Sequence, residues 1–243
     1  MGWRSSTATW LANDTATLLQ ATASGTRENR SQLTVQDGTV TYHGAELKLA
    51  DWRRRVSEMY ARVRAQPAPE SGHALWRAER DELLVTHPQS PLDPGDPLRG
   101  TGVQYWPYQP ALRFELPLLP MPETSRYVIP TGGDESTTLR AIGRIEIPDP
   151  LNGILTLWWL EQYGGGLFLP LRDATAGSTT YGGGRYLLDS AKGADLGGTH
   201  GTLVIDLNFL YHPSCRYSSV WQCPLAPAEN TVTFPVEAGE RLG

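Results

Sequence analysis

Residues 154–160 read Ile-Leu-Thr-Leu-Trp-Trp-Leu, with one polar side chain among seven. A short, nearly continuous apolar run of this kind is typical of a strand buried on both faces. Five further runs on either side of it have the length and apolar content of strands and are separated by turn signals. They lie at residues 111–116, 140–147, 167–171, 202–209 and 231–236. Six strands spaced in this way predict a mainly β protein, with an antiparallel β-barrel or sandwich.

Before these strands the sequence predicts a hairpin. Residues 32–43 form two short alternating runs joined by Asp37-Gly38, a dipeptide suited to a two-residue hairpin turn. A third short run, at 46–49, extends this pattern as a further strand.

Two helices are expected next. Asp51 is a candidate N-cap, and after it apolar side chains recur at three- and four-residue steps until Pro67. A second helix is expected at 72–85. The sequence therefore predicts an N-terminal helical hairpin packed on a sheet. We expect residues 1–70 to hold the β-hairpin and a helix, and residues 71–243 to form the β-rich core domain.

Composition narrows the classes of partner. The 243 residues carry a net charge of −5, with a pI of about 5.6, so the chain has no overall electrostatic footprint for nucleic acid. No apolar stretch approaches the ~20 residues of a membrane span. The first 25 residues lack the apolar region of a secretory signal. We expect a cytoplasmic protein that binds neither nucleic acid nor membranes.

Polar side chains gather at the ends of the later strands. Asp206 and Asn208 have the same parity on their strand, so both are expected on one face. Arg172 and Arg185 are the nearest candidate cations, and each can hold a carboxylate in a bidentate pair. A buried network of ion pairs that only fixes the fold explains the same pattern.

Three motifs in this region resemble a bacterial and archaeal family known as domain of unknown function 1684. The resemblance covers roughly residues 76–240. The first motif comprises Phe168, Leu171, Arg172, Asp173, Thr175, Gly177, Thr180, Tyr181, Gly184, Arg185 and Tyr186. The second comprises Asp206, Asn208, Tyr211, Pro213, Cys215 and Tyr217. The third comprises Cys223, Pro224, Pro227, Glu229 and Asn230, followed by Glu237, Ala238, Gly239 and Glu240.

The chain departs from the family pattern at two positions. Leu207 replaces the usual Phe, and His212 replaces the usual Asn, which adds a titratable group. The resemblance implies no activity, because the family is defined without one.

The two cysteines of the chain, Cys215 and Cys223, lie within nine residues of each other. They could close a disulfide, although a cytoplasmic location disfavours one. They could bind zinc or another soft metal together with His212, in an H-x-x-C spacing, with His200, Asp206 or water as the fourth ligand. They could also be plain thiols, or one could be a nucleophile activated by His212.

We expect a small-molecule-binding protein, and an enzyme if Asp206 or Glu229 acts as acid or base. In this hypothesis Arg172 and Arg185 hold an anionic group of the ligand. The remaining expected ligand-binding residues are Asp173, Thr180, Tyr181, Asn208 and Tyr211. Two alternatives stay open: a metal-dependent enzyme with a His212, Cys215 and Cys223 site, and a non-catalytic protein whose motifs are structural. The sequence indicates no particular cofactor.

Overall fold

The structure is a computed structural model. It describes residues 33–36, 39–42, 44–121, 125–130, 136–199 and 201–243. Contacts divide the chain into two units, Met1–His43 and Gly44–Gly243. The domain boundary expected at residue 70 stays a prediction.

In the first unit, β1 (Leu33–Gln36) and β2 (Thr39–Tyr42) pair antiparallel. The predicted hairpin is therefore confirmed, and its Asp37-Gly38 turn lies outside the described residues.

The second unit begins with a helical pair, as predicted. α1 is Ala45–Arg64 and α2 is Pro69–Thr86, with the short α3 (Leu98–Thr101) after them. Pro69 is the first residue of α2, where its missing N–H costs no hydrogen bond. The strand expected at 46–49 is wrong, and so is the N-cap at Asp51. Both positions lie inside α1, because Glu, Leu and Lys favour helix and continue the helical pattern that follows them.

Five antiparallel strands form the main sheet, in the order β5-β6-β7-β8-β9. Their bounds are Arg126–Pro130, Ser136–Ile147, Gly153–Leu160, Leu167–Leu171 and Arg185–Asp189. The strands predicted at 140–147, 154–160 and 167–171 are thus confirmed. β5 and β9 were not expected from the sequence.

The central strand β7 is buried on both faces, as its sequence predicts. Leu155 and Leu157 join the large apolar cluster on one face. Trp158 and Leu160 join a smaller cluster on the other face. All four side chains are at most 5% exposed.

The side chain of Asn230 continues the sheet where β7 and β8 separate. The two strands pair at Trp158 with Phe168, and in the same register the next rung would join Thr156 to Pro170. Instead, Asn230 Nδ2 donates to the carbonyl oxygens of Thr156 and Pro170, at 2.9 Å each. Its Oδ1 accepts from Trp158 Nε1 at 2.7 Å. One amide therefore satisfies the polar groups that the sheet leaves open.

Two smaller antiparallel pairs complete the described strands. β4 (Arg113–Pro117) pairs with β10 (Thr202–Asp206), and β3 (Gln104–Tyr105) pairs with β11 (Glu240–Arg241). The protein is therefore mainly β with antiparallel sheets. The described strands form no closed barrel, so neither a barrel nor a sandwich is confirmed.

Two strand predictions near the C-terminus need correction. Residues 231–236 form no strand, because Pro235 has no N–H to donate to a ladder. This segment instead forms a few backbone hydrogen bonds with residues 172–174, including an isolated bridge between Thr231 and Arg172. The strand predicted at 202–209 ends at Asp206, and a 3-10 helix, Leu207–Phe209, follows it.

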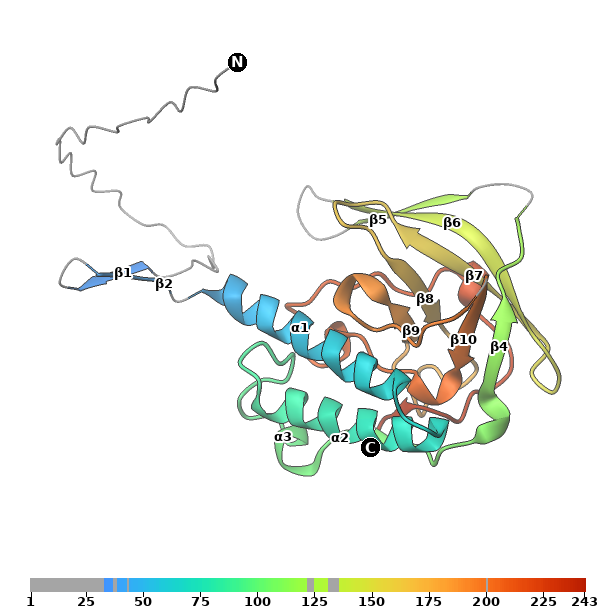
Figure 1. Cartoon of the computed structure of the whole chain (residues 1–243), viewed down its shortest axis with the longest axis horizontal. Helices are drawn as coiled ribbons and strands as arrows, with labels where there is room; N and C mark the ends of the chain where they lie inside the picture. Colours follow the sequence, from blue (N-terminus) through green and yellow to red (C-terminus); the bar gives the residue numbers. More distant parts are fainter. Residues whose placement is uncertain (1–32, 37–38, 43, 122–124, 131–135, 200) are drawn as a thin grey trace, which may run out of the picture. The chain divides into compact units, whose positions relative to one another are not determined.

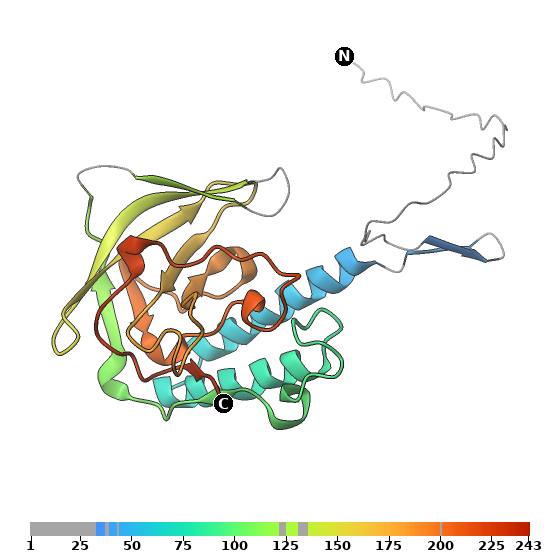
Figure 2. The ribbon, with the colours of Figure 1, turned by 180° about the vertical axis from the view of Figure 1, so that it is seen from behind.

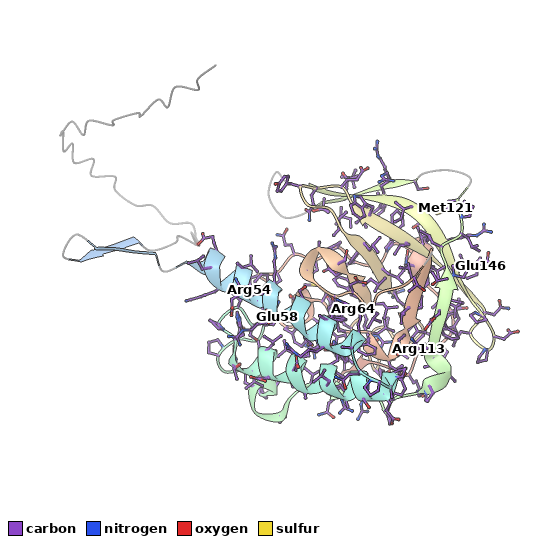
Figure 3. All side chains as sticks on the ribbon, viewed as in Figure 1. Arg54, Glu58, Arg64, Arg113, Met121 and Glu146 are labelled. Atoms are coloured by element: carbon purple, nitrogen blue, oxygen red, sulfur yellow. The ribbon has the colours of Figure 1, made fainter. Side chains whose placement is uncertain are left out.

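α1 and α2 lie side by side against the sheet (Figure 1). The view from behind brings the C-terminal segment, coloured red, to the front, with the two helices behind it (Figure 2). Met59, Tyr60 and Trp76 bring both helices into the same apolar cluster as β7. The basic run of α1 is exposed, and Figure 3 labels Arg54 on it. No helix in the described ranges is long and apolar enough to span a membrane.

Gly143 provides a test of this packing. It lies at the bulge between β6 and β7, and a Cβ there would be 2.8 Å from the carbonyl oxygen of Leu119, which is bridged to Arg144. We expect Gly143→Ala to lower the free energy of unfolding by about 1–3 kcal/mol, because the backbone must shift. Gly95→Ala, where no atom lies within 4 Å, is the control and should change it by less than about 1 kcal/mol. Urea denaturation measures both, and equal effects would contradict the packing described.

Candidate functional site

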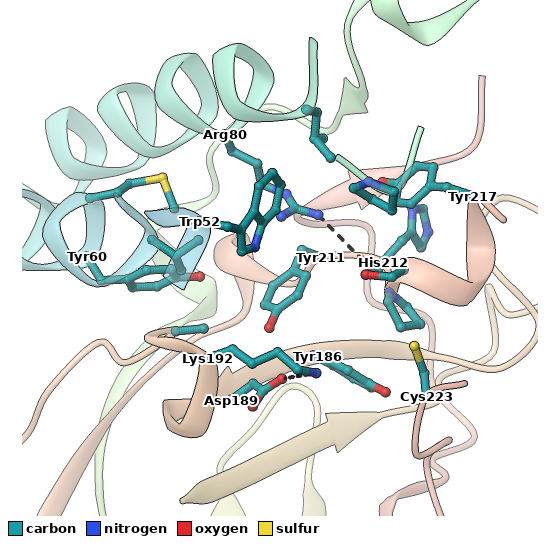
Figure 4. Close-up of a pocket in the computed structure, with 17 residues that line it drawn as sticks. Trp52, Tyr60, Arg80, Tyr186, Asp189, Lys192, Tyr211, His212, Tyr217 and Cys223 are labelled. Atoms are coloured by element: carbon teal, nitrogen blue, oxygen red, sulfur yellow. Dashed lines mark hydrogen bonds and ion pairs between the residues drawn. The ribbon is translucent and has the colours of Figure 1, made fainter. Parts of the chain in front are cut away.

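A small pocket lies between α1, α2 and the turn after β9 (Figure 4), with a volume of about 60 Å³. Its walls come from segments that are distant in the sequence. They are α1, α2, β9 with the 3-10 turn Ser190–Lys192, and residues 211–223. Its main polar side chains are those of Tyr60, Arg80, Asp189, Lys192, Tyr211 and His212.

Arg80 is the principal cation of the pocket. Its side chain is 12% exposed, and its Nε donates to Oε1 of the fully buried Glu240. The guanidinium also lies over the ring of Tyr211, 4.6 Å from its centroid. Within the described residues, the guanidinium donates one further hydrogen bond, from Nη2 to the carbonyl oxygen of His212 at 3.5 Å. The outer part of this guanidinium is therefore left to face the pocket.

Glu240 fixes the position of Arg80. Its Oε2 accepts from the His212 backbone N–H at 2.6 Å and from the Tyr217 hydroxyl at 3.1 Å. Burial alone would raise the pKa of this carboxyl group, but Arg80 and His212 outweigh burial and hold the pKa below its ordinary value. Glu240 is therefore ionised at neutral pH.

The opposite wall carries a second ion pair and a buried carboxylate oxygen that lacks a partner. Lys192 Nζ lies 3.0 Å from Oδ2 of Asp189, and the lysine side chain is half-exposed. The other carboxylate oxygen of Asp189 is buried with no hydrogen-bond partner among the described residues, and the buried hydroxyl of Tyr60 interacts with the side chain of Trp76. Nearly all buried polar groups in proteins are paired, so the Asp189 oxygen marks a place where a bound group is expected.

The tyrosine hydroxyls can act only as neutral hydrogen-bonding groups here. Burial is the largest cause that raises the pKa of Tyr60 and of Tyr211, and nearby Asp189 adds to it. Figure 4 shows both hydroxyls and the Lys192 amino group pointing into the same space.

Three of the residues predicted for ligand binding form one closed network elsewhere. Arg185 is 1% exposed, and its Nη2 donates to Oδ2 of Asp173 at 2.6 Å. Oδ1 of Asp173 accepts from the backbone N–H and the hydroxyl of Thr175, and that hydroxyl lies 2.9 Å from the hydroxyl of Thr180. The remaining bonds of Arg185 go to the C-terminal backbone. They are to the carbonyl oxygens of Val236, Ala238 and Glu240.

Two further charged residues of these motifs, Arg172 and Glu229, are exposed. Arg172 donates from Nε to the carbonyl oxygen of Gly182 at 2.9 Å. Glu229 is exposed next to the buried Asn230. No hydrogen bond among the described residues joins Glu229 to Arg172 or Arg185.

Asp206 and Asn208 meet, although not as neighbours on a strand. Asp206 caps the 3-10 helix and accepts from the backbone N–H of Asn208 at 3.1 Å and from its Nδ2 at 2.7 Å. Tyr108 donates to the other oxygen of Asp206, and Asn208 bonds in both directions to the backbone of Gln109. Burial raises the pKa of Asp206, and these hydrogen bonds oppose that shift.

His212 is buried between two protein partners. Nε2 accepts from the backbone N–H of Tyr181 at 3.3 Å, and Nδ1 lies 3.4 Å from Oε2 of Glu240. Burial is the main cause that lowers the pKa of His212 to about 4. Cys215 and Cys223 are free thiols in mutual contact. In the described part of the chain, no three His, Cys, Asp or Glu side chains form a cluster that could hold a metal ion.

The sequence reasoning selected Tyr211, His212 and Cys223, which line the pocket, but missed most of its other residues. Tyr60 could have been found, because it lies on the predicted apolar face of α1 and carries a hydroxyl. Arg80 has no local signal, because its partner Glu240 is distant in the sequence. Asp189 and Lys192 pair with each other three residues apart, a spacing that could have been noticed.

Removal of the Asp173 carboxylate tests the closed network. We expect Asp173→Ala to lower the free energy of unfolding by about 3–5 kcal/mol, because the buried Arg185 is left without its counter-charge. Asp93→Ala, on an exposed loop, is the matched control and should change it by less than about 0.5 kcal/mol. Chemical denaturation gives both values, and a loss below about 1 kcal/mol for Asp173→Ala would show that the pair is not structural.

The buried His212 predicts a pH dependence of stability. Because its folded pKa of about 4 lies below the ordinary 6.5, the unfolded chain binds a proton first as the pH falls. The contribution of His212 is therefore complete above about pH 6.5 and is lost as the pH approaches 4. Between pH 7 and pH 5 it amounts to about 2 kcal/mol. We expect His212→Asn to remove this part of the pH dependence in denaturant titrations, and an unchanged slope would contradict the neutral, buried imidazole.

Comparison with known proteins agrees with the motifs. The sequence model of the family described as "Protein of unknown function (DUF1684)" matches residues 100–241, more than half of the chain. The solution NMR structure of the uncharacterized protein from gene locus rrnAC0354 of Haloarcula marismortui is 28% identical in sequence, with a TM-score of 0.49. The alignment covers 68% of this chain and 90% of that chain. No curated protein matches the sequence. The resemblance seen in the motifs is thus confirmed, and the chain belongs to the DUF1684 family.

Proposed function

We propose that the protein binds a small molecule with an anionic group, such as a carboxylate or a phosphate, in the pocket between α1, α2 and β9. One observation carries this proposal. One oxygen of the Asp189 carboxylate is buried with no hydrogen-bond partner among the described residues, in a pocket that also holds Arg80, Lys192 and the buried Tyr60 hydroxyl.

Arg80 is positioned to hold the anion. Glu240 takes one edge of its guanidinium, and Nη1 has no hydrogen-bond partner among the described residues. Arginine donors in a fixed plane suit two oxygens of a carboxylate or phosphate. The half-exposed Lys192 supplies a second positive charge beside the opening.

Tyr60 and Asp189 indicate which other polar groups the ligand carries. The Tyr60 hydroxyl would donate to an oxygen, since its raised pKa keeps it protonated. The free oxygen of Asp189 would accept from a hydroxyl or amino group. The best fit is a compact anion that also carries a hydrogen-bond donor, because the cavity is small.

This proposal places the anion beside Arg80 rather than beside Arg185, whose terminal nitrogens are all engaged by protein oxygens. The acid–base roles of Asp206 and Glu229 stay predictions, as does a metal site at His212, Cys215 and Cys223. The Asp173–Arg185 network supports the alternative in which these motifs are structural.

Binding is tested by thermal unfolding with increasing acetate, glycolate and inorganic phosphate. An anion that binds the folded state should stabilise it by about 2.7 kcal/mol at 100 times its Kd. We expect glycolate to bind more tightly than acetate, because only glycolate offers Asp189 a hydroxyl group.

Two substitutions locate the site. Lys192→Met should weaken binding by about tenfold, equivalent to about 1.4 kcal/mol. Tyr60→Phe should also weaken binding, because it removes the hydroxyl that would donate to the anion.

The matched controls are Lys48→Met and Tyr163→Phe, which alter exposed side chains. Lys48 is the other lysine of the chain. Equal anion affinities for the wild type and all four variants would refute the proposed site.

A further inference from the structure

We propose that Cys223 and Cys215 form a thiol pair that exchanges with small disulfides, with Cys223 as the attacking sulfur and Cys215 as the resolving sulfur. They are the two cysteines of the chain, and both are free and half-buried. The inference goes beyond anion binding and does not depend on it.

The geometry joins the two thiols although seven residues separate them. The backbone N–H of Cys215 donates to Sγ of Cys223 at 3.4 Å, and the two side chains also share a hydrogen bond. Cys215 sits in the short 3-10 helix Ser214–Arg216. Both donors converge on Sγ of Cys223, so the local structure favours a negative charge on that sulfur.

Cys223 can be reached by a disulfide from the pocket, and a cation lies nearby. Its sulfur is on the wall of the pocket (Figure 4), which also contains Lys192 and Tyr186. The Tyr186 hydroxyl donates to the carbonyl oxygen of Pro224 at 2.5 Å, which fixes the backbone beside Cys223. Cys223 lines this pocket and Cys215 does not, so a disulfide that reaches the rim of the pocket would meet Cys223 first.

The two thiols differ in acidity in the direction that this order requires. The hydrogen bond from Cys215 is the main cause that lowers the pKa of Cys223 to about 6, and Lys192 contributes to the same shift. The same hydrogen bond, together with burial, raises the pKa of Cys215. Both directions favour a thiolate at Cys223 and a thiol at Cys215.

The exchange proceeds in two steps. In the first, the Cys223 thiolate attacks one sulfur of a disulfide R–S–S–R, the bond between the two R–S groups breaks, and the released RS⁻ takes up a proton. In the second, the Cys215 thiol loses its proton and its sulfur attacks Sγ of Cys223, which releases the second RS⁻. Two electrons pass from the protein to the disulfide. The products are a Cys215–Cys223 disulfide and two RSH molecules.

The test uses the full-length protein and glutathione disulfide at pH 7. The reduced protein is incubated with the disulfide, quenched with acid, labelled with N-ethylmaleimide and mapped by mass spectrometry. We expect the wild type to lose both labelling sites and to gain the internal disulfide. Cys215→Ser should instead accumulate glutathione on Cys223, since serine keeps the hydrogen-bond donor but cannot resolve the mixed disulfide.

Cys223→Ser is the reciprocal control and should react at Cys215 at least about tenfold more slowly. The alkylation rate of Cys223 in the wild type should also rise at a lower pH than that of Cys215. Thermal unfolding verifies that each variant folds. If one variant does not fold, early time points of the wild-type reaction show which cysteine attacks first. We expect glutathione to appear on the peptide that contains Cys223.

Three results would overturn the proposal. They are full maleimide labelling of both cysteines after incubation, equal reaction rates at Cys215 and Cys223 in the reciprocal variants, and a stable mixed disulfide in the wild type.

Discussion

The guanidinium of Arg185 is buried, and each of its terminal nitrogens donates to two protein oxygens. One is the carboxylate of Asp173, and the others belong to the C-terminal backbone between Val236 and Glu240. Burial of an unpaired charge is costly, so this arrangement requires all the partners to be present together. Arg185 thereby attaches the C-terminal segment to the start of β9. The segment contains Glu240, and Glu240 in turn holds Arg80 at the pocket.

The Asp173–Arg185 pair separates residues that build the framework from residues that line the pocket. The motif residues Asp173, Arg185 and Asn230 bind backbone groups and build the framework. The pocket side chains Tyr60, Arg80 and Lys192 come from outside these motifs or from their gaps. A mainly structural role of the motifs is compatible with a binding site beside them, because the motifs set the position of the C-terminal segment on which the site depends.

The sequence predicted those parts of the fold that local patterns determine. The apolar run 154–160 indicated the strand that became β7, and the helical spacing after Asp51 indicated most of α1. β9 was missed because its buried residues begin with Arg185 and end with Asp189, so its charged ends resemble a loop. Residues 231–236 were misread because their alternation is typical of a strand, whereas Pro235 and the bonds to residues 172–174 determine their path.

The candidate site was less predictable for a physical reason. Arg80 and Glu240 are 160 positions apart, and no sequence spacing reports such a contact. The central claim is that Arg80 meets an anion while Arg185 serves the framework. NMR of the arginine Nε–Hε groups during titration with glycolate tests this most directly. The account predicts that the Arg80 signal shifts in a saturable manner and that the Arg185 signal does not. A shift of Arg185 with Arg80 unchanged would contradict it.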